Sequence, residues 1–187
     1  MESELIDIFS VPLYRAKLTI DNDKLLRYCY SMEEKDPGRT ISNLGGYQSN
    51  ELPEDDELDE LFEQITKHSH ILCDQMQISP VYMWGSWVNT NRKGNSNWPH
   101  THNTAIISGV YYVKVPDNSG DIEFQSPTEN LMHPFQECIN SNKYNSDRWS
   151  MPSIESVLYL FPAWLSHGVK PNLSNEDRVS IAFNMVH

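Results

Sequence analysis

Two histidines separated by one residue are the first side chains in this sequence that could share a ligand. They lie in the stretch WPHTHNTAIISGVYY, where His100 and His102 precede a strongly strand-like segment. In an extended chain successive side chains alternate between faces, so these two imidazoles point the same way. The pattern fits a metal site, and it also fits a polar strand face that carries two histidines.

A third histidine follows an apolar strand much later in the chain. In YLFPAWLSHGV the strand ends at Phe161 and Pro162, and a turn leads to His167 beside a glycine. Three imidazoles from two strands would then converge on one metal inside a barrel. Neutral imidazole suits iron, copper, nickel or zinc, and three protein ligands leave positions open for catalysis.

An arginine and a serine share one face of the last strand-like segment, RVSIAF. Arg178 can donate two parallel hydrogen bonds to a carboxylate, and the hydroxyl of Ser180 lies on the same side. This pair indicates a carboxylate-binding site. The competing interpretation is that Arg178 pairs with Asp177, Glu176 or another acidic residue of the surface.

The elements that must position these residues are short strands beyond residue 80. β-branched and aromatic segments, separated by Gly, Pro, Asn and Asp and without helices between them, predict antiparallel pairing in a sandwich or barrel. The expected strands lie within residues 81–91, 104–116, 120–125, 156–162 and 178–186. The polar stretch of residues 130–151 is expected to form a long loop near a functional mouth.

Two helices are expected before these strands, covering one face of the sheet. Asn22 is predicted to cap the first, short helix. The second is predicted to begin at Pro53, because proline suits a first helical position, and to end near Pro80.

Composition narrows the classes of partner. A net charge of −12 opposes non-specific attraction to nucleic acid and to anionic membranes. No apolar run approaches the roughly 20 residues needed to cross a bilayer, and the start lacks the order of a signal peptide. Three cysteines without C-x-x-C spacing are expected to be reduced thiols. We expect a cytoplasmic protein without a membrane or nucleic-acid partner.

As a set, these residues resemble the iron(II)- and 2-oxoglutarate-dependent dioxygenases. H-x-H followed by SGVYYV is similar to a family of such oxygenases from bacteria and phages, and LFPAWLSHGV matches its style of segment. The resemblance covers most of the chain and implies a mainly β fold with N-terminal helices, a double-stranded β-helix of the jelly-roll, cupin-like type. Residues 1–187 would form one domain, with helical cover and edge strands in residues 1–80 and the jelly-roll core in residues 81–187. The setting would be a bacterial or phage-infected cell.

The resemblance also implies roles for individual residues. The implied Fe(II) ligands are His100, His102 and His167. The implied contacts to the cosubstrate 2-oxoglutarate are Arg178, Ser180, Asn184 and either Tyr111 or Tyr112. Arg178, helped by Ser180, would hold the distal carboxylate. Parity does not choose between the two tyrosines without the register of their strand.

One position departs from the wider superfamily, which usually carries an aspartate or glutamate two residues after the first histidine. His102 stands there instead, and a neutral ligand would leave the iron site one unit more positive. Asp121 or Glu123 is the alternative source of a carboxylate ligand.

The function implied is hydroxylation of an unidentified small-molecule or peptidyl substrate, with release of succinate and carbon dioxide. A cupin-like three-histidine dioxygenase is one alternative; it would need no keto acid and would give Arg178 no fixed role. A non-catalytic jelly-roll binding module is another. It would account for the missing carboxylate ligand, but not for three histidines together with Arg178 and Ser180.

Overall fold

Two antiparallel sheets and two helices make up the computed structural model, which describes residues 2–128 and 137–187. The larger sheet has six strands in the order β1-β9-β6-β11-β4-β3, and the smaller has five in the order β2-β5-β10-β7-β8. Apolar side chains from both sheets pack into a shared cluster that includes Val110, Phe124 and Phe161. The predicted mainly β fold of double-stranded β-helix type is therefore confirmed.

The strands agree closely with the expected segments. The larger sheet contains β1 (Tyr14–Lys17), β3 (Tyr47–Gln48), β4 (Tyr82–Asn91), β6 (Ile107–Lys114), β9 (Val157–Pro162) and β11 (Arg178–Val186). The smaller sheet contains β2 (Asn43–Leu44), β5 (Ser96–His100), β7 (Ile122–Gln125), β8 (Arg148–Met151) and β10 (His167–Val169). All five expected strands are present, as β4, β6, β7, β9 and β11.

The expected loop of residues 130–151 is partly wrong. Residues 148–151 form β8, which pairs with β7 along its whole length. An ion pair of 3.1 Å between Arg148 and Glu123 joins the two strands, and β7 would otherwise leave backbone groups unpaired at that edge. The start of the expected loop, up to residue 136, lies outside the described residues.

The predicted cap of helix α1 (Asn22–Lys35) is wrong by one residue. Asp21 is the cap, because its carboxylate accepts a hydrogen bond of 2.9 Å from the backbone N–H of Lys24. Asn22 is the first helical residue, and its side chain donates to the hydroxyl of Ser156 instead.

Helix α2 (Asp59–Met76) begins six residues after the predicted start at Pro53. The side chain of Asp55 accepts a hydrogen bond of 2.9 Å from the N–H of Glu57, and its carbonyl accepts one of 2.8 Å from the N–H of Leu58. This local turn competes with the helix. The helix ends where Gln77 adopts a left-handed conformation, shortly before the predicted end.

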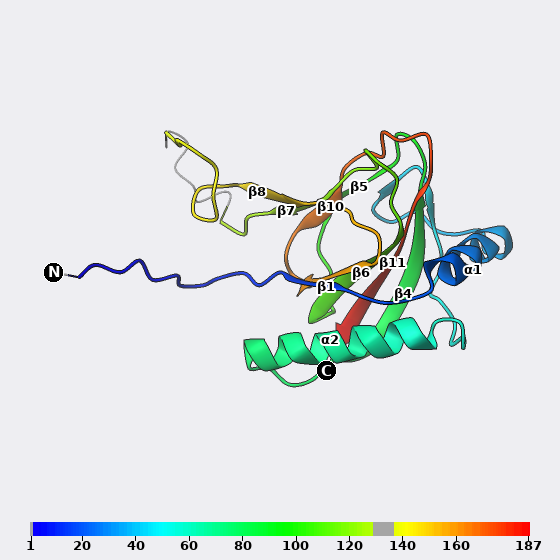
Figure 1. The fold of residues 1–187 in the computed structure, drawn as a ribbon, viewed down its shortest axis with the longest axis horizontal. Helices are drawn as coiled ribbons and strands as arrows, with labels where there is room; N and C mark the ends of the chain where they lie inside the picture. Colours follow the sequence, from blue (N-terminus) through cyan, green and yellow to red (C-terminus); the bar gives the residue numbers. More distant parts are fainter. Residues whose placement is uncertain (1, 129–136) are drawn as a thin grey trace.

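The two faces of the larger sheet differ in chemistry. Both helices contact this sheet (Figure 1), and alternate residues of β11 join the apolar core that they share with it. These residues are Val179, Ile181, Phe183 and Met185. The intervening positions include the buried polar residues Arg178, Ser180 and Asn184. Because side chains alternate along a strand, one face of β11 packs and the other carries polar groups toward the smaller sheet.

A glycine allows the smaller sheet to close around its polar residues. Gly168 on β10 lies so near β5 that an added Cβ would stand 2.9 Å from the carbonyl oxygen of Asn97. Only glycine permits this approach without displacing the backbone of one strand. As a result, His167 at the start of β10 lies directly across from His100 at the end of β5.

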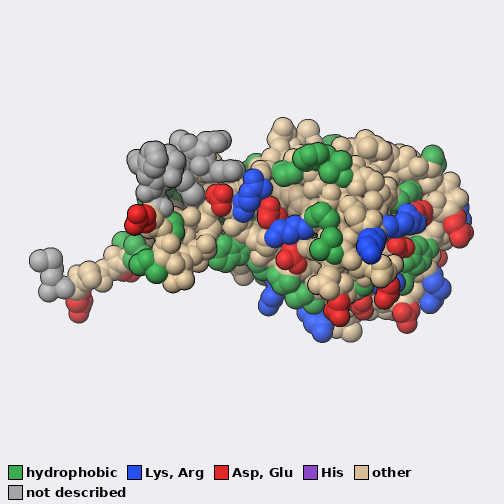
Figure 2. Space-filling view, turned by 90° about the horizontal axis from the view of Figure 1, so that it is seen from above, with side chains coloured by type: hydrophobic (Ala, Val, Ile, Leu, Met, Phe, Trp, Pro, Cys, Tyr) green, Lys and Arg blue, Asp and Glu red, His purple; other side chains and the backbone are tan. Residues whose placement is uncertain are grey.

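The surface is mixed in charge. Lysine, arginine and acidic side chains are interspersed on the face shown in Figure 2, rather than gathered into one basic area. Within the described part of the chain, neither helix has the length and apolar character required to span a bilayer.

Candidate active site

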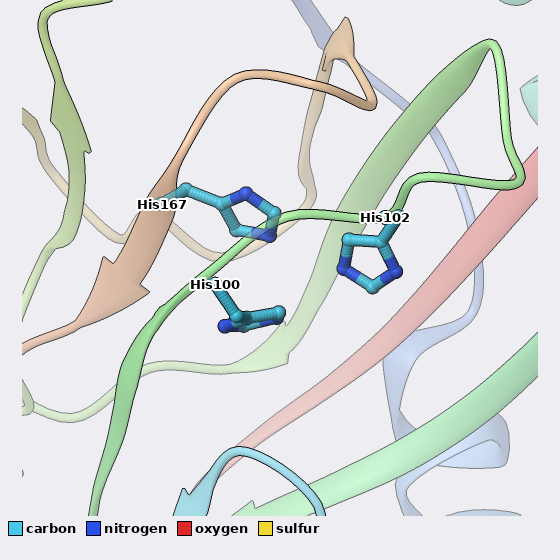
Figure 3. A group of neighbouring side chains, drawn as sticks. All are labelled: His100, His102 and His167. Atoms are coloured by element: carbon cyan, nitrogen blue, oxygen red, sulfur yellow. The ribbon is translucent and has the colours of Figure 1, made fainter.

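Three imidazoles meet between β5 and β10 (Figure 3). The potential ligand atoms of His100, His102 and His167 all lie within 4.8 Å of one another. The expectation that His100 and His102 share one strand is wrong for His102, which lies two residues beyond the end of β5. Its backbone N–H donates a hydrogen bond of 2.9 Å to the carbonyl of Ala163, so the loop holds it in place.

Backbone carbonyls fix the orientation of two of the rings. Nδ1 of His100 lies 2.7 Å from the carbonyl oxygen of Trp98, and Nδ1 of His167 lies 2.9 Å from that of Leu165. A carbonyl oxygen only accepts, so each Nδ1 carries the hydrogen. Nε2 of both rings therefore keeps its lone pair for a metal, an arrangement typical of metal-binding histidines.

An amide supports the third ring. Nδ2 of Asn184 lies 3.1 Å from Nδ1 of His102. The hydroxyl of Ser108 donates a hydrogen bond of 2.7 Å to Oδ1 of the same amide. The two ends of an amide are interchangeable in shape. As it stands, the amide donates to Nδ1 of His102; a metal bound at Nε2 would instead require the amide ends to be exchanged, so that Asn184 accepts from Nδ1–H and donates to Ser108. Asn184 was expected to line the pocket, and the structure places it beside His102.

Burial keeps the three rings neutral. Desolvation lowers the pKa of His167 to about 3 and that of His102 to about 4, and it also lowers the pKa of His100. Mutual repulsion of positive charge among the rings acts in the same direction for His167 and His102. Neutral imidazole is the form that binds a metal, so the site needs no deprotonation near pH 7.

Arg178 is a buried cation that forms no ion pair with any described residue. The residue is only 1% exposed, and its Nη1 donates hydrogen bonds to three backbone carbonyl oxygens. These belong to Ser119, Gly120 and Lys170. Nη2 is buried and has no hydrogen-bond partner. Burial lowers the pKa of the guanidinium, yet an arginine remains charged at any physiological pH.

The expected competing partners of Arg178 are engaged elsewhere. Glu176 forms an ion pair of 3.1 Å with Lys114, and Asp177 accepts a hydrogen bond from Tyr30. In the part of the chain that the structure describes, no carboxylate forms an ion pair with Arg178. Its Nη2 is thus a buried donor that no described carboxylate satisfies.

One cavity joins the arginine to the histidines. Its lining includes the three imidazoles together with Tyr112, Arg178 and Ser180. We call it the cosubstrate cavity. The register of β6 resolves the choice between the tyrosines, because Tyr112 lines this cavity while Tyr111 faces α1 and donates 2.6 Å to the side chain of Asn22.

The alternative carboxylate ligands do not join the histidines. Glu123 forms ion pairs of 3.1 Å with Arg148 and 3.4 Å with Lys170. Among the described residues, the cluster of possible ligand atoms contains the three imidazoles and neither Asp121 nor Glu123. Three neutral nitrogen donors and a buried unpaired guanidinium in one cavity fit a divalent metal and a small carboxylate-bearing molecule.

A second cavity, of about 260 Å³, was not expected from the sequence. It borders His100 and His102 and is lined by Arg39, Gln48 and Trp87, among others. We call it the outer cavity. Trp87 lies on β4, and its ring stacks on that of His102 at 5.8 Å. Aromatic residues in strands usually belong to a core, so the sequence pattern contained no signal for this position.

Solved structures share the fold at low sequence identity. A prolyl-4-hydroxylase from Pseudomonas putida has a TM-score of 0.69 at 10% identity, with 95% of this chain and 94% of that chain covered. HygX from Streptomyces hygroscopicus, with nickel and 2-oxoglutarate bound, has a TM-score of 0.61 at 11% identity, covering 94% of this chain and 83% of that chain.

A prolyl hydroxylase from Trichoplax adhaerens, in complex with a peptide fragment of the hypoxia inducible factor oxygen degradation domain, has a TM-score of 0.62. It is 13% identical, and the match covers 93% of this chain and 83% of that chain. At such identities these likenesses establish the fold alone. No curated protein matches the chain in sequence.

The family comparison goes further than the structures. The model described as "Putative 2OG-Fe(II) oxygenase" matches residues 85–184, which is more than half of the chain. The matched range begins within β4 and ends within β11, so it contains the three histidines, Arg178 and Ser180. The chain belongs to this family of 2-oxoglutarate- and Fe(II)-dependent oxygenases.

Proposed function

We propose that the cosubstrate cavity carries the dioxygenase activity of this chain, with His100, His102 and His167 as the iron ligands. In the same proposal Arg178, assisted by Ser180, holds the distal carboxylate of 2-oxoglutarate. The observation that carries it is the buried Nη2 of Arg178, which has no partner and belongs to the cavity that the histidines line. A buried guanidinium without an anion is costly, and a bound carboxylate removes that cost.

The chain's own residues bind, orient and exclude water. Carbonyl acceptors hold the rings of His100 and His167, and three further carbonyls hold the guanidinium of Arg178 in one orientation. Phe161 packs against His167, with ring centroids 4.6 Å apart, and shields it from solvent. When bound, Fe(II) and 2-oxoglutarate would supply, with dioxygen as the oxidant, the chemistry that yields succinate, carbon dioxide and a hydroxylated product.

Tyr112 is the tyrosine that we assign to the cosubstrate. It lines the cavity, and burial raises the pKa of its hydroxyl, which therefore stays protonated and able to donate a hydrogen bond. We assign Asn184 to the support of His102 rather than to 2-oxoglutarate, because the two side chains are 3.1 Å apart.

The two alternative functions account for less of the site. A cupin-like dioxygenase that uses no keto acid would leave Arg178 buried and unpaired for no purpose. A pure binding module would have no need for three neutral imidazoles that are each oriented by a separate hydrogen-bond partner.

The proposal extends to the setting of the enzyme. Strands β1, β2 and β3 come from residues before 81 and pair within the two sheets, which supports one domain over residues 1–187. The buried thiols of Cys29 and Cys73, which form no disulfide, support a reducing, cytoplasmic compartment. We propose a small-molecule or peptidyl substrate, as for the prolyl hydroxylases of similar fold.

Anaerobic cosubstrate binding tests the proposal. Fe(II) and then 2-oxoglutarate are added to metal-free protein, and the weak visible charge-transfer absorption of a chelated keto acid is recorded. We expect the band in the wild type and its loss or weakening in His167→Ala and Arg178→Ala. Arg27→Ala, on the exposed side of α1, is the matched control and should retain it. Iron binding without the band would favour the cupin-like reading, and no iron binding would overturn the proposal.

A further inference from the structure

We propose that the outer cavity recognises an amide group of the substrate, as presented by a segment of peptide. This inference rests on the proposed function, because the cavity is useful for oxidation only if the histidines beside it hold iron. It adds the chemical class of the substrate, which neither the family nor the fold supplies.

The location of the outer cavity suits the molecule to be oxidised. It shares Trp87, His100 and His102 with the cosubstrate cavity. Arg178 lines only the cosubstrate cavity, whereas Arg39 and Gln48 line only the outer one. The imidazoles therefore border two spaces, one with each arginine, and a molecule in the outer cavity would lie against the proposed iron ligands.

Arg39 contributes an unpaired donor. Its Nε is buried and has no hydrogen-bond partner, and no described carboxylate forms an ion pair with its guanidinium. The guanidinium lies over the ring of Trp87, with 5.8 Å between its central carbon and the ring centroid. Trp87 in turn stacks on His102 at 5.8 Å. This stack fixes the donor at a set place relative to the metal site.

Gln48 contributes an unpaired acceptor. The residue is 4% exposed, and its Oε1 is buried without a hydrogen-bond partner. Its backbone carbonyl accepts a hydrogen bond of 2.8 Å from the N–H of Arg39, so the two residues are joined at the backbone. An unpaired donor and an unpaired acceptor on adjoining backbone segments call for a ligand that offers one of each.

An amide is a neutral group that meets both demands, with its donor and its acceptor on two separate atoms. Its carbonyl can accept from Nε–H of Arg39, and its N–H can donate to Oε1 of Gln48. A carboxylate would satisfy Arg39 alone and would meet the carboxylate of Glu51, which also lines the cavity. An amine would satisfy Gln48 but would be repelled by the guanidinium. Buried polar groups left unpaired by a wrong ligand make such a site selective.

The rim favours a peptide over a free amino-acid amide. Ile41 and Trp84 line the outer cavity and are 65% and 53% exposed, respectively. Exposed apolar side chains beside a polar cleft are typical of surfaces that bind peptides or proteins. They would cover the apolar side chains on either side of the recognised amide.

The test measures binding without turnover. Anaerobic protein with Fe(II) and 2-oxoglutarate is dialysed against a pool of capped tetrapeptides that vary in their apolar residue, and retained peptides are identified by mass. The affinity of the best peptide is then compared with that of the analogue in which one amide at a time becomes an ester. N-acetyl amino-acid methylamides form the small-molecule arm.

We expect one ester replacement to weaken binding about tenfold. Arg39→Gln and Gln48→Leu should each weaken binding of the parent peptide by about the same factor. Only Gln48→Leu should then bind the ester and the amide equally, because the ester lacks the N–H that donates to Gln48, whereas Arg39→Gln should still prefer the amide. Arg39→Lys, which keeps the charge but lacks Nε, should behave like Arg39→Gln if the donor is what matters. Arg27→Gln is the control for arginine content and should bind as the wild type.

The outcomes separate this inference from the function beneath it. A charge-transfer band with no retained amide, or with amide and ester bound equally by the wild type, would overturn the amide site and leave the oxygenase site intact. Binding of the methylamides as tightly as the peptides would overturn the peptide as the source. Absence of the band would overturn the proposed function, whatever the peptides do.

Discussion

The two faces of β11 show how one strand divides stability from chemistry. Ile181 and its alternate neighbours are fully buried in the apolar core beneath the helices. Arg178, Ser180 and Asn184 are also buried but face the space between the sheets. The apolar face stabilises the fold by removing hydrocarbon from water. The polar face opposes folding until a ligand completes its hydrogen bonds, as the unpaired Nη2 of Arg178 shows.

The largest effect is expected on the apolar face. Ile181→Ala should lower the free energy of unfolding by about 2–5 kcal/mol, because it leaves a cavity in a closely packed core. Urea unfolding of the metal-free protein measures this change. Iron affinity per folded molecule should stay at the wild-type value, since Ile181 faces away from the cosubstrate cavity. A folded variant that fails to bind iron would break the division between the faces.

Three residues earlier, a change at Arg178 is expected to affect cosubstrate binding more than stability. Arg178→Met should weaken 2-oxoglutarate binding by about 2–4 kcal/mol, roughly 30- to 1000-fold, because the charged donors to the distal carboxylate are lost. The free energy of unfolding should fall by less than in Ile181→Ala, because the loss of the Nη1 hydrogen bonds to three carbonyls is offset by the removal of a buried charge. Anaerobic titration and urea unfolding together measure both quantities. Undiminished cosubstrate affinity would contradict the proposed clamp.

A smaller effect is expected at Asn184, which supports a ligand rather than binding one. Asn184→Ala should weaken binding of Fe(II) by about 10- to 100-fold, because the ring of His102 loses its hydrogen-bonding partner. Asn184→Asp should restore affinity, since a carboxylate accepts from Nδ1–H. Calorimetric titration with Fe(II) under anaerobic conditions measures this order. Equal loss in both variants would indicate a packing role only.

Acidification should destabilise the metal-free protein through the histidines that face β11. The pKa of His167 is about 3 in the folded state and about 6.5 when unfolded, so the unfolded chain binds more protons between these values. The free energy of unfolding should therefore fall by about 1.4 kcal/mol per pH unit from His167 alone as pH drops below about 6.5. Urea unfolding at several pH values tests the sign. In His167→Asn the slope should decrease.

The smallest effect is expected at Ser180. Ser180→Ala should weaken 2-oxoglutarate binding by about 1.5 kcal/mol, the lower end of the range for one hydrogen bond to a charged group. The matched change on the other face, Ile181→Val, should lower the free energy of unfolding by a similar amount and leave cosubstrate affinity unchanged. A Ser180→Ala variant that loses all cosubstrate binding would mean that the serine, not Arg178, is the main contact.

The starts of both helices differ from those that the sequence predicted. Pro53 and the acidic residues after it are good helix-start signals, yet the helix begins at Asp59. The side chain of Asp55 bonds to the backbone two residues on and holds a turn. Asp21 and Asn22 are nearly equivalent as caps by residue type. Contacts with the rest of the molecule, such as that of Asn22 with Ser156, decide between them.

The site could be read from the sequence only in part. Alternation predicted that Arg178 and Ser180 share a face, and both line the cosubstrate cavity. The same alternation predicted that His100 and His102 share a strand face. This is only partly right, because His102 lies beyond the strand and is held by a hydrogen bond to the carbonyl of Ala163. No sequence pattern indicated the outer cavity, because Arg39, Gln48 and Trp87 come from separate segments of the chain.

The sequence by itself determined five of the strands, the alternating faces of β11 and the family, because these depend on residue types at short spacing. Only the tertiary structure decided that His100 lies across from His167, that Tyr112 rather than Tyr111 faces the cavity, and that Arg178 forms no ion pair with an acidic residue of the described chain. Each of these depends on strand register and on the choice of distant neighbours. Those are set by the packing of the whole chain, in which a shift of one residue would turn every side chain to the other face.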